Sequence, residues 1–213
     1  MKLYSLQQGR SMVEMMGYMF VVLTVVVAIG NLVTNVFEEH KYSRASIQLT
    51  DLVGIIVKAA AIDPDYKDVV NMINGTSDDA NKNAEGKKMI PYSFRIVSDG
   101  GKNILYHVFG GEAKITLNPL DEEDGDNKFG ITFTGLTRKQ CMELAIKDWQ
   151  KNQYADLYAV KINSNNVWYW PVYKASPVNS LPITRAKLTG TTAEDMGQCS
   201  ENGKKNQVMW VFF

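Results

Sequence analysis

Histidine and cysteine are scarce in this sequence, which has two of each among its 213 residues. His40 and His107 are far apart, and neither has a second histidine or a cysteine close in sequence, which argues against a zinc site. No serine, cysteine or carboxylate pair comes with a positioned histidine, and no phosphate-binding loop can be recognised. The sequence therefore predicts no enzyme, no cofactor and no metal site.

A net charge is also lacking, because 23 Lys and Arg residues balance 23 Asp and Glu residues. Bulk electrostatics then favour neither a nucleic acid nor an acidic membrane surface as a partner, and we expect no nucleic acid to bind. The length suits one ordinary globular domain with an appendage and is short for two full domains.

No charged residue occurs from Met15 to Phe37. As a helix this stretch would span roughly 34 Å, whereas the hydrocarbon core of a bilayer is about 30 Å thick. Lys2 and Arg10 precede it, and nothing up to Val13 is acidic. The positive-inside rule therefore predicts a cytoplasmic N-terminus and a single membrane span, with the rest of the chain across the membrane.

Two interpretations of this stretch need only its hydropathy. One is a signal anchor that tethers a domain. The other is a cleaved secretory signal peptide, since Ala28 and Gly30 are small residues of the kind that its cleavage site prefers. Neither accounts for Glu14, which stands directly before the apolar run. A carboxylate costs about 2–3 kcal/mol at the centre of a bilayer and less near the interface, so such a residue usually marks function.

The segment from Gln8 to Met16, QGRSMVEMM, contains a recognisable motif. It resembles the leader junction of type IV pilins and of type II secretion pseudopilins. That family has a short polar leader with a basic residue, cleavage after a glycine, and a glutamate as the fifth residue of the mature chain. The resemblance implies cleavage between Gly9 and Arg10, with Lys2 as the basic leader residue and Glu14 as the fifth mature residue.

Arg10 departs from the family pattern, in which the first mature residue is commonly apolar and N-methylated. Its side chain lies four residues before Glu14, where an ion pair within one helix can form in the weaker of the two orientations. Such a pair would compete with a contact between Glu14 and a neighbouring subunit, so the resemblance gives both residues a role in assembly.

The resemblance implies a structural subunit of a type IV pilus, closest in layout to type IVb pilins. Such a subunit starts in the bacterial inner membrane, is cut by the prepilin peptidase, and joins an extracellular homo-oligomeric filament with the help of an assembly platform protein and an ATPase. The implied divisions are a leader (1–9), a transmembrane and assembly helix (10–37) and a globular domain (38–213) that includes the second half of the helix.

Two alternatives stay open at this point. A pseudopilin of a type II secretion system has the same leader junction, and differs in whether long filaments appear outside the cell. A periplasmic binding domain on a plain signal anchor belongs to a different class of protein, and detection of Arg10 as the mature N-terminus would exclude it.

Proline is absent before Pro64, so nothing interrupts a helix from about Ser11 to Ile62. Past the membrane run, six apolar residues fall on one face at helical spacing and predict a buried stripe: Ala45, Leu49, Leu52, Val53, Ile56 and Ala60. Residues 65–89 are mostly polar and predict a connecting loop with at most a short helix near Val69–Ile73.

Several later segments have the composition and alternation of strands. They are Tyr92–Ile96, Ile104–Phe109, Ala113–Leu117, Phe129–Phe133, Leu157–Ile162, Val167–Tyr173 and Val208–Phe213. Thr137 followed by Gln140 predicts a capping box that opens a helix through Cys141. The expected fold class is α+β, with the long helix packed on an antiparallel sheet.

The two cysteines add to the resemblance. An even count outside the cytosol indicates one disulfide, and type IV pilins, especially the type IVb subclass, have a C-terminal region closed by one disulfide and followed by a final strand. The resemblance therefore implies a bond between Cys141 and Cys199. Two further segments stay open. Asp121–Asp126 is an acidic loop without the spacing of an EF-hand, and it suits either a calcium site or a solvated loop. Trp168–Trp170 is an aromatic run that suits an adhesive patch or a core and subunit interface.

Overall fold

The computed structural model describes residues 12–61, 66–119, 128–147, 157–163, 168–170, 181–182, 199 and 203–213. The chain divides into two compact units, Met1–His40 and Lys41–Phe213.

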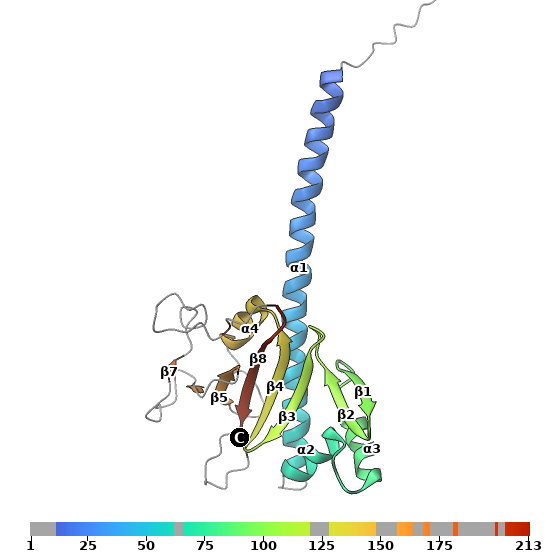
Figure 1. Cartoon of the computed structure of the whole chain (residues 1–213), viewed down its shortest axis with the longest axis vertical. Helices are drawn as coiled ribbons and strands as arrows, with labels where there is room; N and C mark the ends of the chain where they lie inside the picture. Colours follow the sequence, from blue (N-terminus) through green and yellow to red (C-terminus); the bar gives the residue numbers. More distant parts are fainter. Residues whose placement is uncertain are drawn as a thin grey trace, which may run out of the picture. The chain divides into compact units, whose positions relative to one another are not determined.

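One helix, α1, runs from Met12 to Ala60 and belongs to both units (Figure 1). It matches the helix predicted from about Ser11 to Ile62. The sequence forms this helix because no proline breaks it and because most of its residues are apolar or good helix formers. At 1.5 Å per residue its 49 residues extend for roughly 73 Å.

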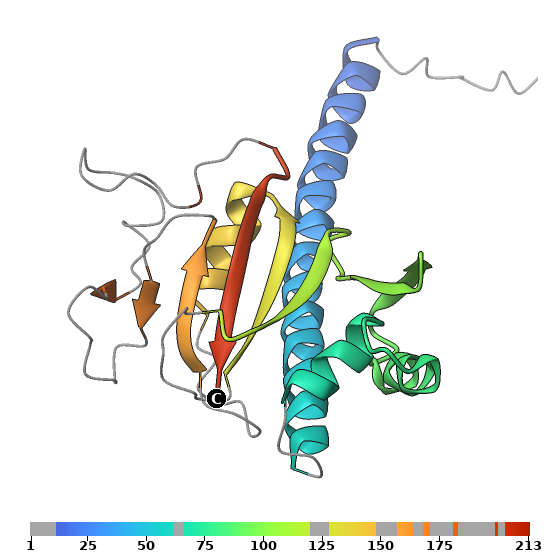
Figure 2. The same ribbon diagram turned by 60° about the horizontal axis from the view of Figure 1, so that its bottom comes forward.

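A sheet of eight strands forms most of the second unit, in the order β1-β2-β3-β4-β8-β5-β6-β7. All neighbours pair antiparallel except β6 and β7, which are parallel. The strands are β1 (Arg95–Asp99), β2 (Lys102–Tyr106), β3 (Glu112–Leu117), β4 (Phe129–Leu136), β5 (Leu157–Ile162), β6 (Trp168–Trp170), β7 (Leu181–Pro182) and β8 (Asn206–Phe212). The last strand in sequence, β8, therefore lies between β4 and β5 (Figure 2).

The core lies between the sheet and the part of α1 that belongs to the second unit. Figures 1 and 2 show this part running along one face of the sheet. The predicted stripe is buried there, with Leu49, Leu52 and Ile56 fully inaccessible. They meet inward-facing strand residues, among them Phe133 and Trp210, whose rings are 5.3 Å apart in an edge-to-face contact.

Two helices replace most of the loop that the sequence predicted over residues 65–89. They are α2 (Tyr66–Asn74), which contains the anticipated short apolar patch, and α3 (Ala80–Met89), which the sequence did not predict. A cap begins α3, because the Asp79 side chain accepts the backbone N–H of Asn81 at 2.8 Å. Gly86 allows the close packing of the two helices, since a Cβ there would lie 2.1 Å from the carbonyl oxygen of Met72.

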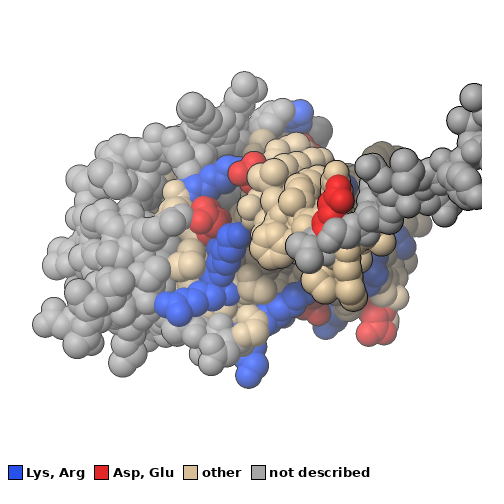
Figure 3. All heavy atoms as spheres, turned by 90° about the horizontal axis from the view of Figure 1, so that it is seen from above, with Lys and Arg blue, Asp and Glu red and all other residues tan. Residues whose placement is uncertain are grey.

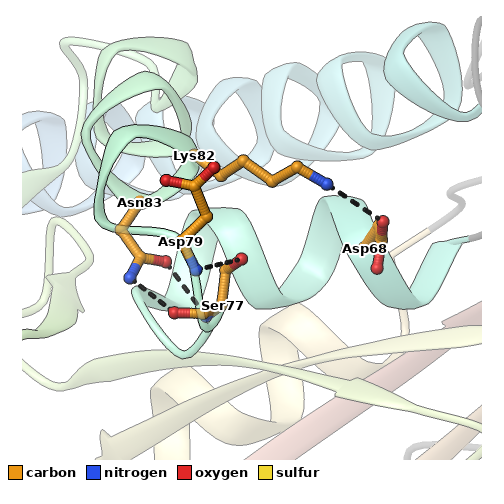
Figure 4. A network of polar contacts seen from close by, with 5 residues as sticks. All are labelled: Asp68, Ser77, Asp79, Lys82 and Asn83. Carbon is orange, nitrogen blue, oxygen red and sulfur yellow. Dashed lines mark hydrogen bonds and ion pairs between the residues drawn. The ribbon is translucent and has the colours of Figure 1, made fainter.

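A polar network holds the α2–α3 connection in place (Figure 4). Two hydrogen bonds join the Asn83 side chain to the backbone of Ser77. The side chain accepts the Ser77 N–H at 3.0 Å and donates to the Ser77 carbonyl at 2.9 Å. Lys82 and Asp68 form an ion pair at 3.5 Å between the two helices. Each side chain of that pair is about half exposed, so the pair contributes little to stability.

The first predicted strands are displaced in the structure. The strand predicted over Tyr92–Ile96 begins at Arg95, because Phe94 N–H bonds to the carbonyl of Pro91 in a turn. The strand predicted over Ile104–Phe109 ends at Tyr106, where a turn closed by the bond from Gly110 N–H to His107 O follows.

Helix α4 (Arg138–Ala145) begins with the predicted capping box, in which Thr137 and Gln140 bond reciprocally. Cys141 in its first turn is joined to Cys199 by a disulfide, with the Cα atoms 5.8 Å apart. Both cysteines are fully buried. The bond closes a loop across 58 positions and fixes this helix to the segment before β8.

Candidate functional site: an apolar helix that carries one acidic residue

The first unit presents a large apolar surface. In the described part of the chain, one helix is long and apolar enough to cross a membrane by length and composition. Its large apolar side chains before Glu38, as far as the structure describes them, are at least 46 % exposed: Met12, Met15, Met16, Tyr18, Met19, Phe20, Val21, Val22, Leu23, Val25, Val26, Val27, Ile29, Leu32, Val33, Val36 and Phe37. Soluble monomers rarely expose a contiguous apolar surface of this kind, so it marks an interaction site.

The two threonines within this surface bond to the backbone of the same helix. Thr24 donates its hydroxyl to the carbonyl of Val21 at 2.8 Å, and Thr34 donates to the carbonyl of Asn31 at 2.9 Å. Hydroxyls that bond the preceding turn need no water, which is the condition for placing threonine in an apolar environment. The helix is therefore suited to a surrounding of lipid or of other helices.

Glu14 is the acidic residue in the first turn of α1, and its side chain is exposed. A carboxylate in the first turn interacts favourably with the positive end of the helix dipole. Gly9 and Arg10, the residues of the predicted cleavage site, lie outside the described residues, so the structure does not describe the Arg10–Glu14 pair.

A buried amide joins α1 to the turns before β1 and after β2. Gln48 is 1 % exposed and lies on the face of α1 that contains the apolar stripe. Its Nε2 donates to the carbonyl of Ser93 at 2.5 Å, and its Oε1 accepts the backbone N–H of Val108 at 2.9 Å. The sequence gives no signal for this role, because a single glutamine does not indicate that it will face two orphaned backbone groups.

His107 occupies a second polar position inside the core. Its ring stacks on Phe133 with centroids 4.6 Å apart, its Nε2 is 2.8 Å from the carbonyl of Thr134, and its Nδ1 accepts the N–H of Phe109. These partners assign a neutral ring with the proton on Nε2. Burial lowers the pKa of His107 to about 4, with a smaller contribution from Lys204, against the effect of the Thr134 bond. The histidine is therefore a structural residue.

The structure describes one of the two segments that the sequence left open. Trp168–Trp170 forms the short strand β6, whereas the loop Asp121–Asp126 lies outside the described residues. Among the residues that the structure describes, no cluster of His, Cys, Asp or Glu side chains has the arrangement of a metal site. The basic and acidic side chains on the face drawn in Figure 3 are interspersed.

A long apolar N-terminal helix, an antiparallel sheet and one disulfide before the last strand together define the α+β layout of a pilin. The family described as PilS N terminal matches residues 57–212, more than half of the chain, and the chain belongs to this family of type IV pilins. This match begins after the segment Gln8–Met16, so it is independent of the resemblance that this segment carries.

Among solved structures, the chain is similar to a type IVb pilin from Salmonella typhi. The two are 12 % identical with a TM-score of 0.44, and the alignment covers 77 % of this chain and 96 % of that one. No curated protein matches the sequence.

Proposed function

We propose that this protein is a filament subunit of a type IV pilus that is processed after Gly9 and polymerises through α1. The observation that carries the proposal is the bare apolar surface of residues 12–37 on a chain whose other unit is a pilin domain. Exposed apolar surface of this extent is unfavourable in water. A lipid bilayer covers it before assembly, and helices of other subunits cover it in the filament.

The domain organisation follows from this role. Residues 1–9 form the leader, residues 10–37 the membrane-spanning and assembly helix, and residues 38–213 the globular domain. The N-terminus faces the cytoplasm, where Lys2 and Arg10 lie on the side that the positive-inside rule favours. Prepilin peptidase, an assembly platform protein and an ATPase act on the subunit, as they do in the family.

Glu14 directs assembly in this proposal. A carboxylate without a partner is costly inside an apolar bundle of helices, so a neighbouring subunit that brings a cation removes that cost. Cleavage after Gly9 creates such a cation, the α-amine of Arg10. Its contact with Glu14 of a neighbour sets the axial register of packing, which apolar contacts alone define weakly.

Two measurements on the native host test the proposal. Mass spectrometry of the mature protein is expected to find Arg10 as the first residue, and retention of Met1 or a start at Asn31 contradicts the processing step. Electron microscopy of a deletion strain is expected to show the loss of long surface filaments, with return on complementation. Processing at Arg10 without any long filament would identify a secretion pseudopilin in place of a pilus subunit.

A further inference from the structure

Strand β1 stands at one end of the strand order, so among the strands that the structure describes it has a partner, β2, on one side only (Figure 1). Four of its five residues are exposed: Arg95, Val97, Ser98 and Asp99. An edge strand presents a row of backbone N–H and C=O groups that can pair with another chain. The open edge of β1 is therefore a candidate interaction surface of the second unit, outside the assembly helix.

The register of the β1–β2 hairpin determines which backbone groups face this edge. Asp99 pairs with Lys102 across the loop 100–101, two glycines with φ values of 56° and 87°, as a type I′ turn requires. The bond of the turn joins this pair, and hydrogen-bonded pairs alternate from there along the strands. The odd-numbered residues of β1 therefore bond to β2, whereas Ile96 and Ser98 direct their N–H and C=O groups to the open edge.

The side chains of β1 alternate between two faces. Ile96 packs against the core, and the Ser98 hydroxyl accepts a hydrogen bond of 2.9 Å from helix α3. Arg95, Val97 and Asp99 lie on the opposite face. Their charges are opposite in sign and stand at equal distances from the central valine, with the basic residue two positions before it and the acidic residue two positions after it.

This arrangement suits a second copy of the same strand that runs antiparallel to the first. In the register centred on Val97, each Arg95 lies across from Asp99 of the other copy, and the two Val97 residues lie across from each other. The same register sets Ile96 across from Ser98, so the outward backbone groups of both strands find partners. Parallel strands in register would place each charge beside its like, which is unfavourable.

The positions of these side chains strengthen the pairing. Arg95, Val97 and Asp99 would occupy the pairs that are not hydrogen-bonded, where facing Cα atoms are only about 4.5 Å apart and side chains are closest. Opposite charges and apolar side chains that face each other there stabilise a sheet. Val97 is 38 % exposed, so the contact also covers apolar surface. Charges of a single sign would repel a second copy, whereas this mirrored pair attracts it.

We infer that β1 pairs antiparallel with β1 of a second copy of this chain, in the register centred on Val97. The contact uses the same surface of both chains about a two-fold axis, whereas the subunits of a helical filament meet through two different surfaces. It is therefore distinct from assembly through α1, and its failure and the failure of the proposed pilus function are separate results. A strand of five residues covers less area than a standard interface, so we expect a weak contact.

Cross-linking of the full chain in detergent micelles tests the register. Val97→Cys sets two thiols across from each other at a Cα separation that a disulfide can bridge. The native cysteines are joined and buried, so the introduced thiol is the one that reacts. Lys102→Cys is the matched control, because it is exposed on the same face of the hairpin but its copies would be three strand spacings apart, roughly 14 Å.

Under mild oxidation we expect a covalent dimer from Val97→Cys and only background cross-linking from Lys102→Cys. Equal cross-linking of the two variants overturns the inference, because a chance encounter or association through detergent-bound helices would not select the centre of β1.

Charge reversal in the Val97→Cys protein tests the facing pairs. Arg95→Asp sets carboxylates opposite each other at both ends of the contact, and it is expected to lower the rate of cross-linking about tenfold. Lys88→Asp, at an exposed position on α3, changes the net charge equally and should leave the rate unchanged. Adding Asp99→Arg to Arg95→Asp restores opposite charges and should recover the rate.

The recovery separates a contact between chains from an effect within one chain. The Arg95 guanidinium lies 4.8 Å from the centroid of the Tyr106 ring of its own hairpin, and Asp99→Arg does not replace that contact. A rate that stays low in the doubly reversed protein, or a loss of equal size with Lys88→Asp, contradicts the inferred pairing.

Discussion

Gln48 on α1 and Val108 in the turn after β2 are joined by a hydrogen bond of 2.9 Å across 60 positions of the chain. The same side chain donates to Ser93 O, so one amide satisfies two backbone groups from different loops. Because Gln48 lies in the part of α1 that belongs to the second unit, this amide helps to hold that part of the helix in the domain.

Replacement of Gln48 is expected to destabilise the domain. Gln48→Ala leaves the Val108 N–H and the Ser93 carbonyl without partners, at a cost of roughly 2–4 kcal/mol in the free energy of unfolding. Ile47→Ala, at the neighbouring and 53 % exposed position, is the matched control, with a change of about 0.5 kcal/mol or less. Denaturant unfolding of the full chain in detergent measures both, and equal effects would show that the amide has no anchoring role.

His107 predicts a loss of stability in acid. The pKa of this residue is about 4 in the folded protein and about 6.5 in the unfolded chain, so the unfolded state binds more protons between these values. The contribution of His107 is complete above pH 6.5 and declines as the pH falls to 4, by about 3 kcal/mol in total. The unfolding free energy of His107→Phe, measured across this range, should lack that component, while His40 is present in both proteins. An unchanged slope contradicts the prediction.

Adding a methyl group is expected to destabilise the protein at both Gly110 and Gly111, but for different reasons: backbone strain at Gly110 and steric overlap at Gly111. A Cβ on Gly111 would lie 1.8 Å from the carbonyl oxygen of Thr134, so Gly111→Ala forces β4 and the turn apart and costs several kcal/mol, on the order of 3. Gly110 has open space around it and a φ of 85°, so Gly110→Ala costs only backbone strain of about 1 kcal/mol. Thermal unfolding of the two variants should rank them in that order, and the reverse order would refute the close approach.

The disulfide is expected to stabilise the domain by about 4 kcal/mol, since it closes a loop across 58 positions. The double variant Cys141→Ser, Cys199→Ser should lose that amount in denaturant unfolding. A reductant should lower the stability of the parent protein and leave the double variant unaffected. Identical unfolding of the parent with and without reductant would argue against the bond.

Glu14 tests the assembly mechanism. Glu14→Gln and Glu14→Ala are expected to insert, to be cleaved and to fold, yet to enter filaments poorly, because no charge favours the correct register. Glu39→Gln, an exposed acidic residue on the same helix beyond the apolar run, is the control and should assemble normally. Arg10→Met should assemble as well as the parent or better if the arginine competes for Glu14. Counts of tagged subunits in filaments with co-expressed parent protein provide the measurement, and normal incorporation of Glu14→Ala excludes a register role.

The sequence predicted those parts of the fold whose signals are local. Helix α1 was predictable because proline is absent before Pro64, and the capping box at Thr137 was readable from two residue types at fixed spacing. Helix α3 was not, because its sequence ANKNAEGKKM has no apolar stripe and it is held instead by the Asp79 cap and by close packing at Gly86.

The functional residues also differ in whether the local sequence indicates them. Glu14 stood out because a charge beside an apolar run is visible along the chain. Gln48 did not stand out, because the backbone groups that it bonds belong to Ser93 and Val108, which are 45 and 60 positions away in the chain. Contacts between distant segments could not be predicted, because the alternation within a single strand does not encode which segment it will pair with.

The central position of β8 has a consequence for synthesis of the chain. Until residues 206–212 emerge, β4 and β5 have no partner on the sides that β8 covers, and each exposes an unpaired edge. A chain terminated before Asn206 would keep those two edges permanently open and would be prone to pair with other unfinished chains. A chain that includes β8 pairs both of these edges, so we expect it to be less prone to aggregation and proteolysis than the shortened chain.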